Sequence, residues 1–234
     1  MELLGKQEKD PIDFTKRAHQ YPFSSVGMVV SKKMVSKNMV LCIGIGCLIG
    51  PNVVLTCAHN VYQVDIRKDH QDIEFIPAPI AREIRSKEYS RKGFSVKEII
   101  VPDQYKNMDR FLRDEYNQGL LFDMAVLILD PQLNLEEYFG SLSYNFAWEE
   151  SPFIKNIEIM KDLELIGFPR VSYVHQFYQY LCSAISASNF MLYSLSTLPG
   201  SSGSPLLLPH KNEPYTVIAI HVLDVSHIEE LKVK

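Results

Sequence analysis

The most apolar segment of the chain, MVLCIGIGCLIGPNVVL at residues 39–55, most constrains what the chain can fold into. It is shorter than the roughly 20 residues that a membrane-spanning helix needs, and glycines, a proline and an asparagine interrupt it. Gly50-Pro51-Asn52 favours a turn, and residues that favour strands stand on both sides of it. The segment therefore predicts no membrane span but a β-hairpin with the arms LCIGIGCLI and VVLT.

Other short runs of β-branched and aromatic residues predict further strands, and helix signals are scarce. One helical turn is expected at 58–62, and a short helix at 226–234, where a serine can cap its start. The polar runs 82–92 and 103–118 are interpreted as solvated surface loops. This pattern indicates an all-β protein, sandwich or barrel, with strands at 25–30, 97–101, 124–129, 164–166, 176–185, 189–192, 205–208 and 216–222.

A stretch around the only tryptophan is interpreted as the crossing between two halves, each with enough strands for a small barrel. The expected division is an N-terminal segment (1–20), a first β-barrel half (21–140), the crossing (141–156) and a second β-barrel half (157–234).

Charge and cysteine content narrow the choice of partner and compartment. The 24 Lys and Arg against 28 Asp and Glu give a net charge of -4, so the chain has no electrostatic footprint for nucleic acid. The four cysteines (Cys42, Cys47, Cys57 and Cys182) are too few for a disulfide scaffold and predict free buried thiols, although a Cys47–Cys57 bridge across the hairpin stays open. The charged start of the chain does not look like a signal peptide, which favours an intracellular location.

Three polar residues stand where serine hydrolysis would need them. Ser202 lies in the small-residue run PGSSGSP, His59 ends the strand VVLTCAH, and Asp123 leads the strand DMAVLIL. Taken singly, each has a structural alternative: a flexible turn, a structural histidine and a strand cap. Together they supply a hydroxyl nucleophile, an imidazole base and an acid in the chymotrypsin-type chain order. In the α/β-hydrolase order the acid and the histidine follow the serine, and too few residues follow Ser202 for the rest of that fold.

At these motifs the sequence resembles the trypsin-like, chymotrypsin-fold serine peptidases, and within them the glutamyl-endopeptidase branch. The matching segments are GCLIGPNVVLTCAH at 46–59, DMAVL at 123–127 and GSSGSP at 200–205, and the resemblance runs from about Tyr21 to Val222. It implies an all-β fold of two six-stranded antiparallel β-barrels with a shortened C-terminal end. It also implies a protein or peptide substrate, and no metal or organic cofactor.

The resemblance assigns roles to individual residues. Ser202 is the expected nucleophile, His59 the general base and Asp123 the group that orients the imidazole, while the backbone N–H groups of Gly200 and Ser202 form the oxyanion hole. Thr197 and His221 match the residues that read an acidic side chain in the glutamyl branch, which implies cleavage after Glu or Asp. A core-facing strand residue is the alternative for His221.

The sequence departs from the pattern of the family at two places, and the second of these supports another interpretation. Ser201 stands where the classical fold has an acid before the nucleophile, so activation through an ion pair to a new N-terminus is not expected. Leu223 and Asp224 follow His221, where the glutamyl branch has residues that leave the pocket open, and the chain ends soon afterwards. The alternative is therefore a protease-like binding or scaffold protein that is catalytically weak or inactive.

Overall fold

The structure is a computed structural model. It describes residues 8–11, 17–78, 93–108, 119–144, 160–167, 170–171, 174–175, 178–187, 190–193, 200–210 and 214–222.

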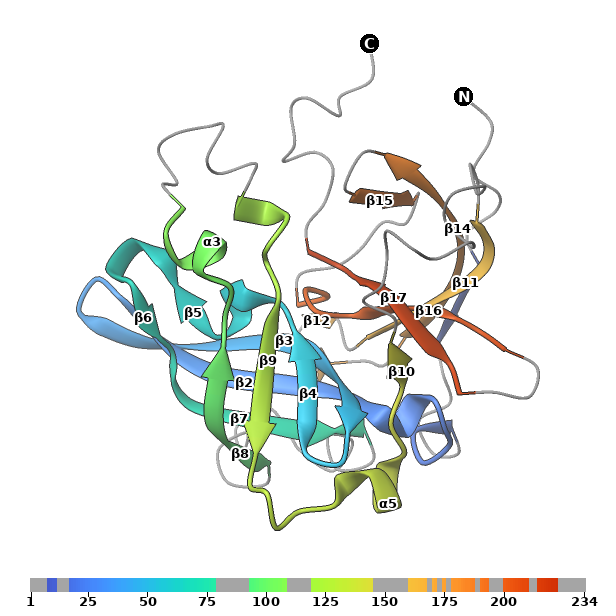
Figure 1. Cartoon of the computed structure of the whole chain (residues 1–234), viewed down its shortest axis with the longest axis horizontal. Coiled ribbons are helices and arrows are strands. Elements are labelled where there is room, and N and C mark those ends of the chain that lie inside the picture. Colours follow the sequence, from blue (N-terminus) through green and yellow to red (C-terminus); the bar gives the residue numbers. More distant parts are fainter. Residues whose placement is uncertain are drawn as a thin grey trace.

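Strands make up most of the described chain (Figure 1). They are β1 (Glu8–Pro11), β2 (Val26–Val35), β3 (Asn38–Gly50), β4 (Val53–Thr56), β5 (Tyr62–Gln63), β6 (Lys68–Asp69), β7 (Gln71–Pro77), β8 (Phe94–Ile100), β9 (Ala125–Leu129), β10 (Ser143–Tyr144), β11 (Met160–Gly167), β12 (Arg170–Val171), β13 (Val174–His175), β14 (Tyr178–Ala187), β15 (Phe190–Tyr193), β16 (Pro205–Leu208) and β17 (Thr216–Ile220). The helical elements are short: η1 (Phe23–Ser25), η2 (Ala58–Asn60), η3 (Val64–Ile66), α3 (Asp103–Lys106) and α5 (Leu135–Phe139). The all-β prediction is confirmed.

The first half closes into a barrel in the order β2-β3-β4-β9-β8-β7. The predicted hairpin is present as β3 and β4, with Pro51 and Asn52 between them. Burial alternates along β9, where Ala125, Leu127 and Leu129 are buried and the residues between them are not. This period of two is what a strand with one face toward a barrel interior requires.

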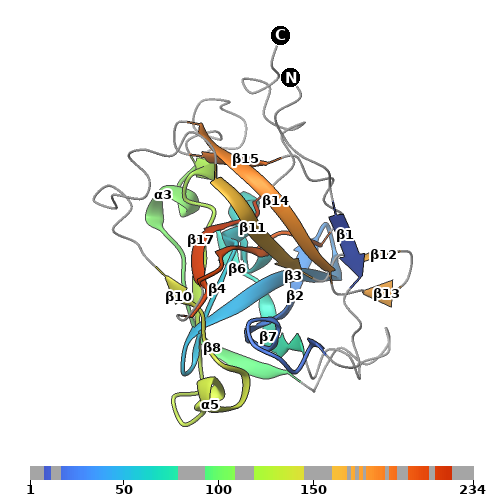
Figure 2. The same cartoon turned by 90° about the vertical axis from the view of Figure 1, so that its right-hand side faces the viewer.

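The second half is a seven-stranded sheet with the order β1-β14-β11-β16-β17-β10, and β15 adds to β14 (Figure 2). Its strands pair antiparallel except β10, which runs parallel to β17. The expectation of purely antiparallel pairing is therefore wrong at this edge. β10 comes from the connection that leaves the first half, so no tight hairpin fixes its direction. The pairing of β1 with β14 was not predicted from sequence.

A shared apolar cluster joins the two halves. Met28 and Ile45 from the barrel pack in it with Ile166, Leu207 and Val217 from the second sheet, and all five are buried. A backbone hydrogen bond of 2.8 Å from the Ile45 N–H to the Ser202 carbonyl oxygen also crosses between the halves. The predicted catalytic residues therefore lie on two units that pack directly against each other.

Some predictions differ from the structure or lie outside it. The expected surface loop at 103–118 begins with α3, and Tyr105 is only 1% exposed because its ring packs in the barrel core, against Tyr62. β7 was missed because Asp72 and Glu74 stand among its apolar residues, although Ile73, Phe75 and Ile76 are buried. The runs 82–92 and 226–234 lie outside the described residues. No helix in the described part of the chain is long and apolar enough to span a membrane.

The cysteines give a test of the fold. Cys42, Cys47 and Cys57 are free thiols, and β3 pairs Cys47 with Leu55 rather than with Cys57. Burial raises the pKa of the Cys47 thiol to about 12, so the reactive thiolate is scarce at neutral pH. We expect iodoacetamide to modify the half-buried Cys42 first and to reach Cys47 and Cys57 only on unfolding, as mapped by mass spectrometry. A Cys47–Cys57 disulfide, or equal rates at all three thiols, would contradict this structure.

Candidate active site

His59 lies in a short helical turn at the end of the barrel. β4 ends at Thr56, and η2 then turns the chain, with the Asn60 N–H donating to the Cys57 carbonyl oxygen at 3.2 Å. Ala58 and Asn60 are buried, whereas the His59 side chain is 32% exposed. The turn therefore presents the imidazole at the surface of an otherwise buried segment.

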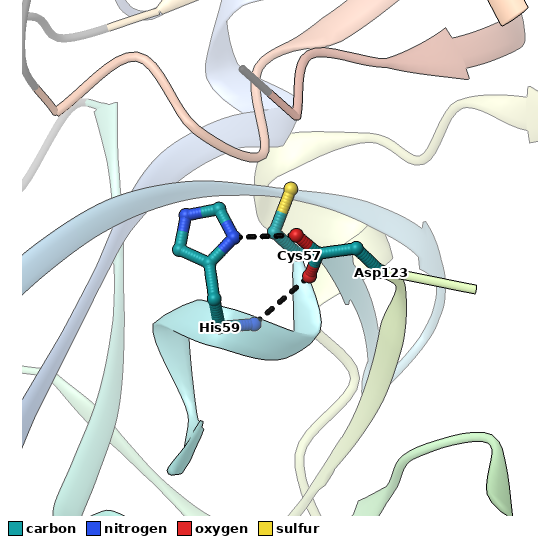
Figure 3. Close-up of side chains that lie close together, drawn as sticks. All are labelled: Cys57, His59 and Asp123. Carbon is teal, nitrogen blue, oxygen red and sulfur yellow. Dashed lines mark hydrogen bonds and ion pairs between the residues drawn. The ribbon is translucent and has the colours of Figure 1, made fainter. Parts of the chain in front are cut away.

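Asp123 reaches His59 because β9 pairs with β4, with Ala125 opposite Thr56. One carboxylate oxygen lies 2.7 Å from His59 Nδ1, and the other accepts the His59 backbone N–H at 3.0 Å (Figure 3). Asp123 is only 3% exposed, so these hydrogen bonds replace water around its charge. A carboxylate can only accept, so Nδ1 carries a proton, and in the neutral imidazole the lone pair is then on Nε2.

The loop that carries Ser202 depends on two glycines. Gly200 and Gly203 have φ values of 92° and 89°, in the left-handed region that favours glycine. A Cβ atom on Gly203 would also collide with the Ile45 carbonyl oxygen and would lie 2.8 Å from the Thr56 hydroxyl. The small-residue run predicted as a tight turn is therefore needed for the close approach of this loop to β3 and β4.

The Ser202 loop is attached to the His59 turn through Asn60. The Asn60 amide nitrogen donates to the Ser202 carbonyl oxygen and to the Thr56 hydroxyl, both at 3.0 Å. Gly44 leaves room for this amide, since a Cβ atom there would overlap it. Sequence analysis missed Asn60, and the only signal was an amide next to His59 in an apolar segment.

A second buried network holds the His59 turn from the other side. The Ser31 hydroxyl lies 2.8 Å from both the Asn60 carbonyl oxygen and His70 Nδ1. Burial lowers the pKa of His70 to about 4, so this imidazole is neutral near pH 7. The hydroxyl then donates to the carbonyl oxygen and accepts from the ring.

The Ser202 hydroxyl is partly exposed and donates to the Val222 carbonyl oxygen at 3.4 Å. That distance is long for a hydrogen bond, so little holds the hydroxyl in this rotamer. Between the described residues Ser202 and His59 there is no side-chain hydrogen bond. Catalytic hydrogen bonds are often loose before substrate binds, so this geometry is compatible with a nucleophile and base.

Backbone donors also lie in the Ser202 loop. The N–H groups of Gly203 and Ser204 donate to His221 and Ser201 carbonyl oxygens, at 2.7 and 3.0 Å. The N–H groups of Gly200 and Ser202 have no acceptor in the described part of the chain. Two unpaired N–H groups beside a hydroxyl can stabilise an oxyanion that forms there.

Of the residues predicted to set the specificity, the structure describes His221 but not Thr197. His221 directly follows β17, is 8% exposed, and its N–H donates to the Ser204 carbonyl oxygen at 2.8 Å. Its carbonyl oxygen accepts the Cys57 thiol at 3.2 Å. Thr197, Leu223 and Asp224 lie outside the described residues. The structure therefore brings His59 and Asp123 into contact, places Ser202 and His221 beside them, and leaves Thr197 unplaced.

Comparisons with known proteins agree with this fold. No model of a known protein family matches the chain. Exfoliative toxin A of Staphylococcus aureus is 26% identical over 214 residues, which cover 92% of this chain. The match spans 65% of the length of that toxin.

Two solved structures are similar over most of the chain. A Glu endopeptidase in complex with MPD has a TM-score of 0.63 at 18% identity and covers 95% of this chain and 88% of its own. A thermostable serine protease, AL20, from an extremophilic microorganism has a TM-score of 0.59 at 13% identity, with 86% and 85% coverage. The protein therefore has the chymotrypsin fold of these serine proteases, and the resemblance inferred from its motifs is confirmed.

The contacts of Asn60 give a test of how the Ser202 loop is held. Asn60→Ala removes one of the two donors to the Ser202 carbonyl oxygen, which still accepts from the Ile45 N–H, and one such hydrogen bond contributes about 0.5–1.5 kcal/mol to stability. We expect a lower melting temperature and, for the activity proposed below, a drop of roughly tenfold in kcat with KM little changed, because Ser202 loses its fixed position. The matched control is Asn134→Ala, which removes an exposed amide bonded to Glu137 at 2.6 Å. A variant that is less stable but keeps its kcat would assign Asn60 a structural role only.

Proposed function

We propose that this protein is a serine endopeptidase that hydrolyses peptide bonds through His59, Asp123 and Ser202. The observation that carries the proposal is the double contact of the buried Asp123 carboxylate with the side chain and backbone of His59. This contact fixes the imidazole tautomer that a general base requires. It lies beside a loop that presents a partly exposed serine and two N–H groups for which the described residues supply no acceptor.

In the proposed mechanism the Ser202 oxygen attacks the carbonyl carbon of the scissile bond while His59 Nε2 takes the hydroxyl proton. The negative charge on the carbonyl oxygen is stabilised by the N–H groups of Gly200 and Ser202. Collapse of this intermediate breaks the C–N bond, and His59 returns the proton to the leaving amine. Water then hydrolyses the acyl-enzyme by the same route, and Asp123 stabilises the imidazolium formed in each step.

The local structure favours Ser202 over its neighbours as the nucleophile. Ser201 and Ser204 are 3% and 1% exposed, and their hydroxyls have no hydrogen-bond partner within the described chain. A buried hydroxyl cannot meet a peptide carbonyl. Ser202 is the partly exposed serine of the three, and it is the one whose backbone is tied to Asn60.

Labelling with a fluorophosphonate tests the mechanism, because the reaction needs a nucleophile, a base and an oxyanion hole but little of the specificity pocket. We expect Ser202→Ala to abolish labelling and to lower peptide hydrolysis by about 10⁴ to 10⁶ while the fold is retained. Ser201→Ala and Ser204→Ala are the matched controls and should still be labelled. Retention of wild-type activity in Ser202→Ala would refute the assigned nucleophile.

A protease-like binding or scaffold protein is the second candidate. The hydrogen bond of the Ser202 hydroxyl to Val222, rather than to His59, favours it. The two candidates differ in one result: a folded wild-type protein that no fluorophosphonate labels supports the binding protein.

For the specificity of the proposed enzyme, we infer cleavage after Glu or Asp. The similarity to a Glu endopeptidase supports this inference, as does His221, an imidazole held by backbone bonds to the loop of the nucleophile. Thr197 is the proposed second donor to the substrate carboxylate. The Asp224 carboxylate would oppose an acidic side chain if it faces the pocket.

Substitution of His221 tests the acidic specificity. A charge-assisted hydrogen bond is worth about 1.5–3 kcal/mol, so His221→Ala should lower cleavage after Glu roughly ten- to a hundredfold. Slow cleavage after neutral residues should be spared. If the Asp224 carboxylate faces the pocket, Asp224→Gly should raise cleavage after Glu. A peptide-library profile in which Arg, Lys or large apolar residues are preferred would contradict this specificity and leave the proposed triad standing.

A further inference from the structure

Cys57 lies next to the proposed triad and has no part in the mechanism above. Its sulfur, a ring nitrogen of His59 and a carboxylate oxygen of Asp123 all lie within 4.8 Å of one another. Figure 3 shows the Cys57 thiol and the His59 imidazole next to the Asp123 carboxylate, with a dashed line from the imidazole to the carboxylate. Among the described residues, this is the group of at least three His, Cys, Asp or Glu side chains that lie close enough together to bind one metal ion.

The three groups are a ligand set that zinc-like cations prefer. Thiolate, imidazole and carboxylate bind Zn²⁺ at about 2.0–2.3 Å, so two ligands on a tetrahedral ion lie roughly 3.3–3.8 Å apart. Side-chain movements of about 1 Å would therefore bring all three to bonding distance. The 32% exposure of the His59 side chain gives an ion and a fourth, water ligand access from solvent.

Charge balance also favours a divalent ion. Cys57 is fully buried and Asp123 is 3% exposed, so an unbalanced charge here would be costly. A thiolate, a carboxylate and a neutral imidazole carry two negative charges, which a divalent cation cancels. The protonated thiol donates to the His221 carbonyl oxygen at 3.2 Å.

We propose that Cys57, His59 and Asp123 form a reversible site for a thiophilic divalent cation such as Zn²⁺, and that the bound ion switches off the hydrolase. The ion displaces the thiol proton, which leaves to solvent, and binds Nδ1 of His59. The ring proton moves from Nδ1 to Nε2, so the imidazole stays neutral. Nε2 then has no lone pair to accept the Ser202 proton, and the base is lost. The inhibition rests on the proposed function, whereas the binding does not.

Cadmium is a direct probe of the binding, because a Cd²⁺–thiolate bond absorbs in the ultraviolet and Cd²⁺ shares the ligand preferences of Zn²⁺. We expect the full-length protein to gain this absorbance at one ion per chain and to release one proton. Cys57→Ser should abolish the signal. Of the other thiols that the structure describes, Cys47 is fully buried and Cys42 half-buried, and Cys47→Ser and Cys42→Ser should both retain the signal. An unchanged signal in Cys57→Ser, or none in the wild type, would overturn the proposal.

His59→Ala is a second variant for the case that Cys57→Ser does not fold. The His59 side chain is partly exposed and the His59 backbone N–H still donates to Asp123 in this variant, so we expect it to fold with reduced stability and to bind Cd²⁺ at least tenfold more weakly. Equal affinity in His59→Ala and the wild type would show that the imidazole is not a ligand.

Inhibition is measured by fluorophosphonate labelling in the presence of Zn²⁺. We expect labelling of the wild type to stop with Zn²⁺ and to return with EDTA, while Cys57→Ser is labelled at Zn²⁺ concentrations at least tenfold higher. Labelling that Zn²⁺ does not suppress overturns the inhibitory site and leaves the proposed function intact. A metal-free protein that is never labelled, but binds Cd²⁺ through Cys57, refutes the proposed function and supports the binding site.

Discussion

The site depends on one buried charge, the carboxylate of Asp123. Both of its oxygens accept hydrogen bonds from His59, and almost no water reaches them. A buried carboxylate without such donors would be strongly destabilising, so the His59 turn and the start of β9 must fold together. The pairing of β4 with β9 places the two residues side by side, and the closed barrel holds that pairing in register.

The second half is joined to the barrel by a shared apolar cluster and by a few polar contacts. The Ser202 carbonyl oxygen accepts from both Ile45 and Asn60, so the loop of the proposed nucleophile is fixed to the barrel rather than only to its own sheet. Gly203 makes this approach possible, because no side chain fits between the loop and the Ile45 carbonyl oxygen. Apolar packing brings the halves together, and these hydrogen bonds fix the position of Ser202 relative to His59.

Much of this could be predicted from sequence because local patterns carry it. The apolar run that is interrupted at Gly50-Pro51-Asn52 predicts a hairpin, and the glycines around Ser202 predict a tight turn. The contacts of Asn60 and Cys57 could not be predicted, since they join segments far apart in the chain: Asn60 with Ser202, and Cys57 with Asp123 and His221. The contacts with Ser202 and His221 depend on how the two halves dock, and the contact between Cys57 and Asp123 depends on the pairing of β4 with β9, so neither follows from the periodicity of one segment. The burial of Tyr105 was missed for a related reason, because its neighbours in sequence are polar and its partners lie elsewhere in the barrel.

A crystal structure of the protein after reaction with a small fluorophosphonate tests the central claim most directly. The account predicts a phosphorus–oxygen bond to Ser202, with the phosphonyl oxygen about 2.7–3.1 Å from the N–H groups of Gly200 and Ser202. The Asp123 carboxylate should still hold His59 Nδ1, with Nε2 facing the adduct. An adduct on another residue, or a phosphonyl oxygen that points away from both N–H groups, would contradict the account.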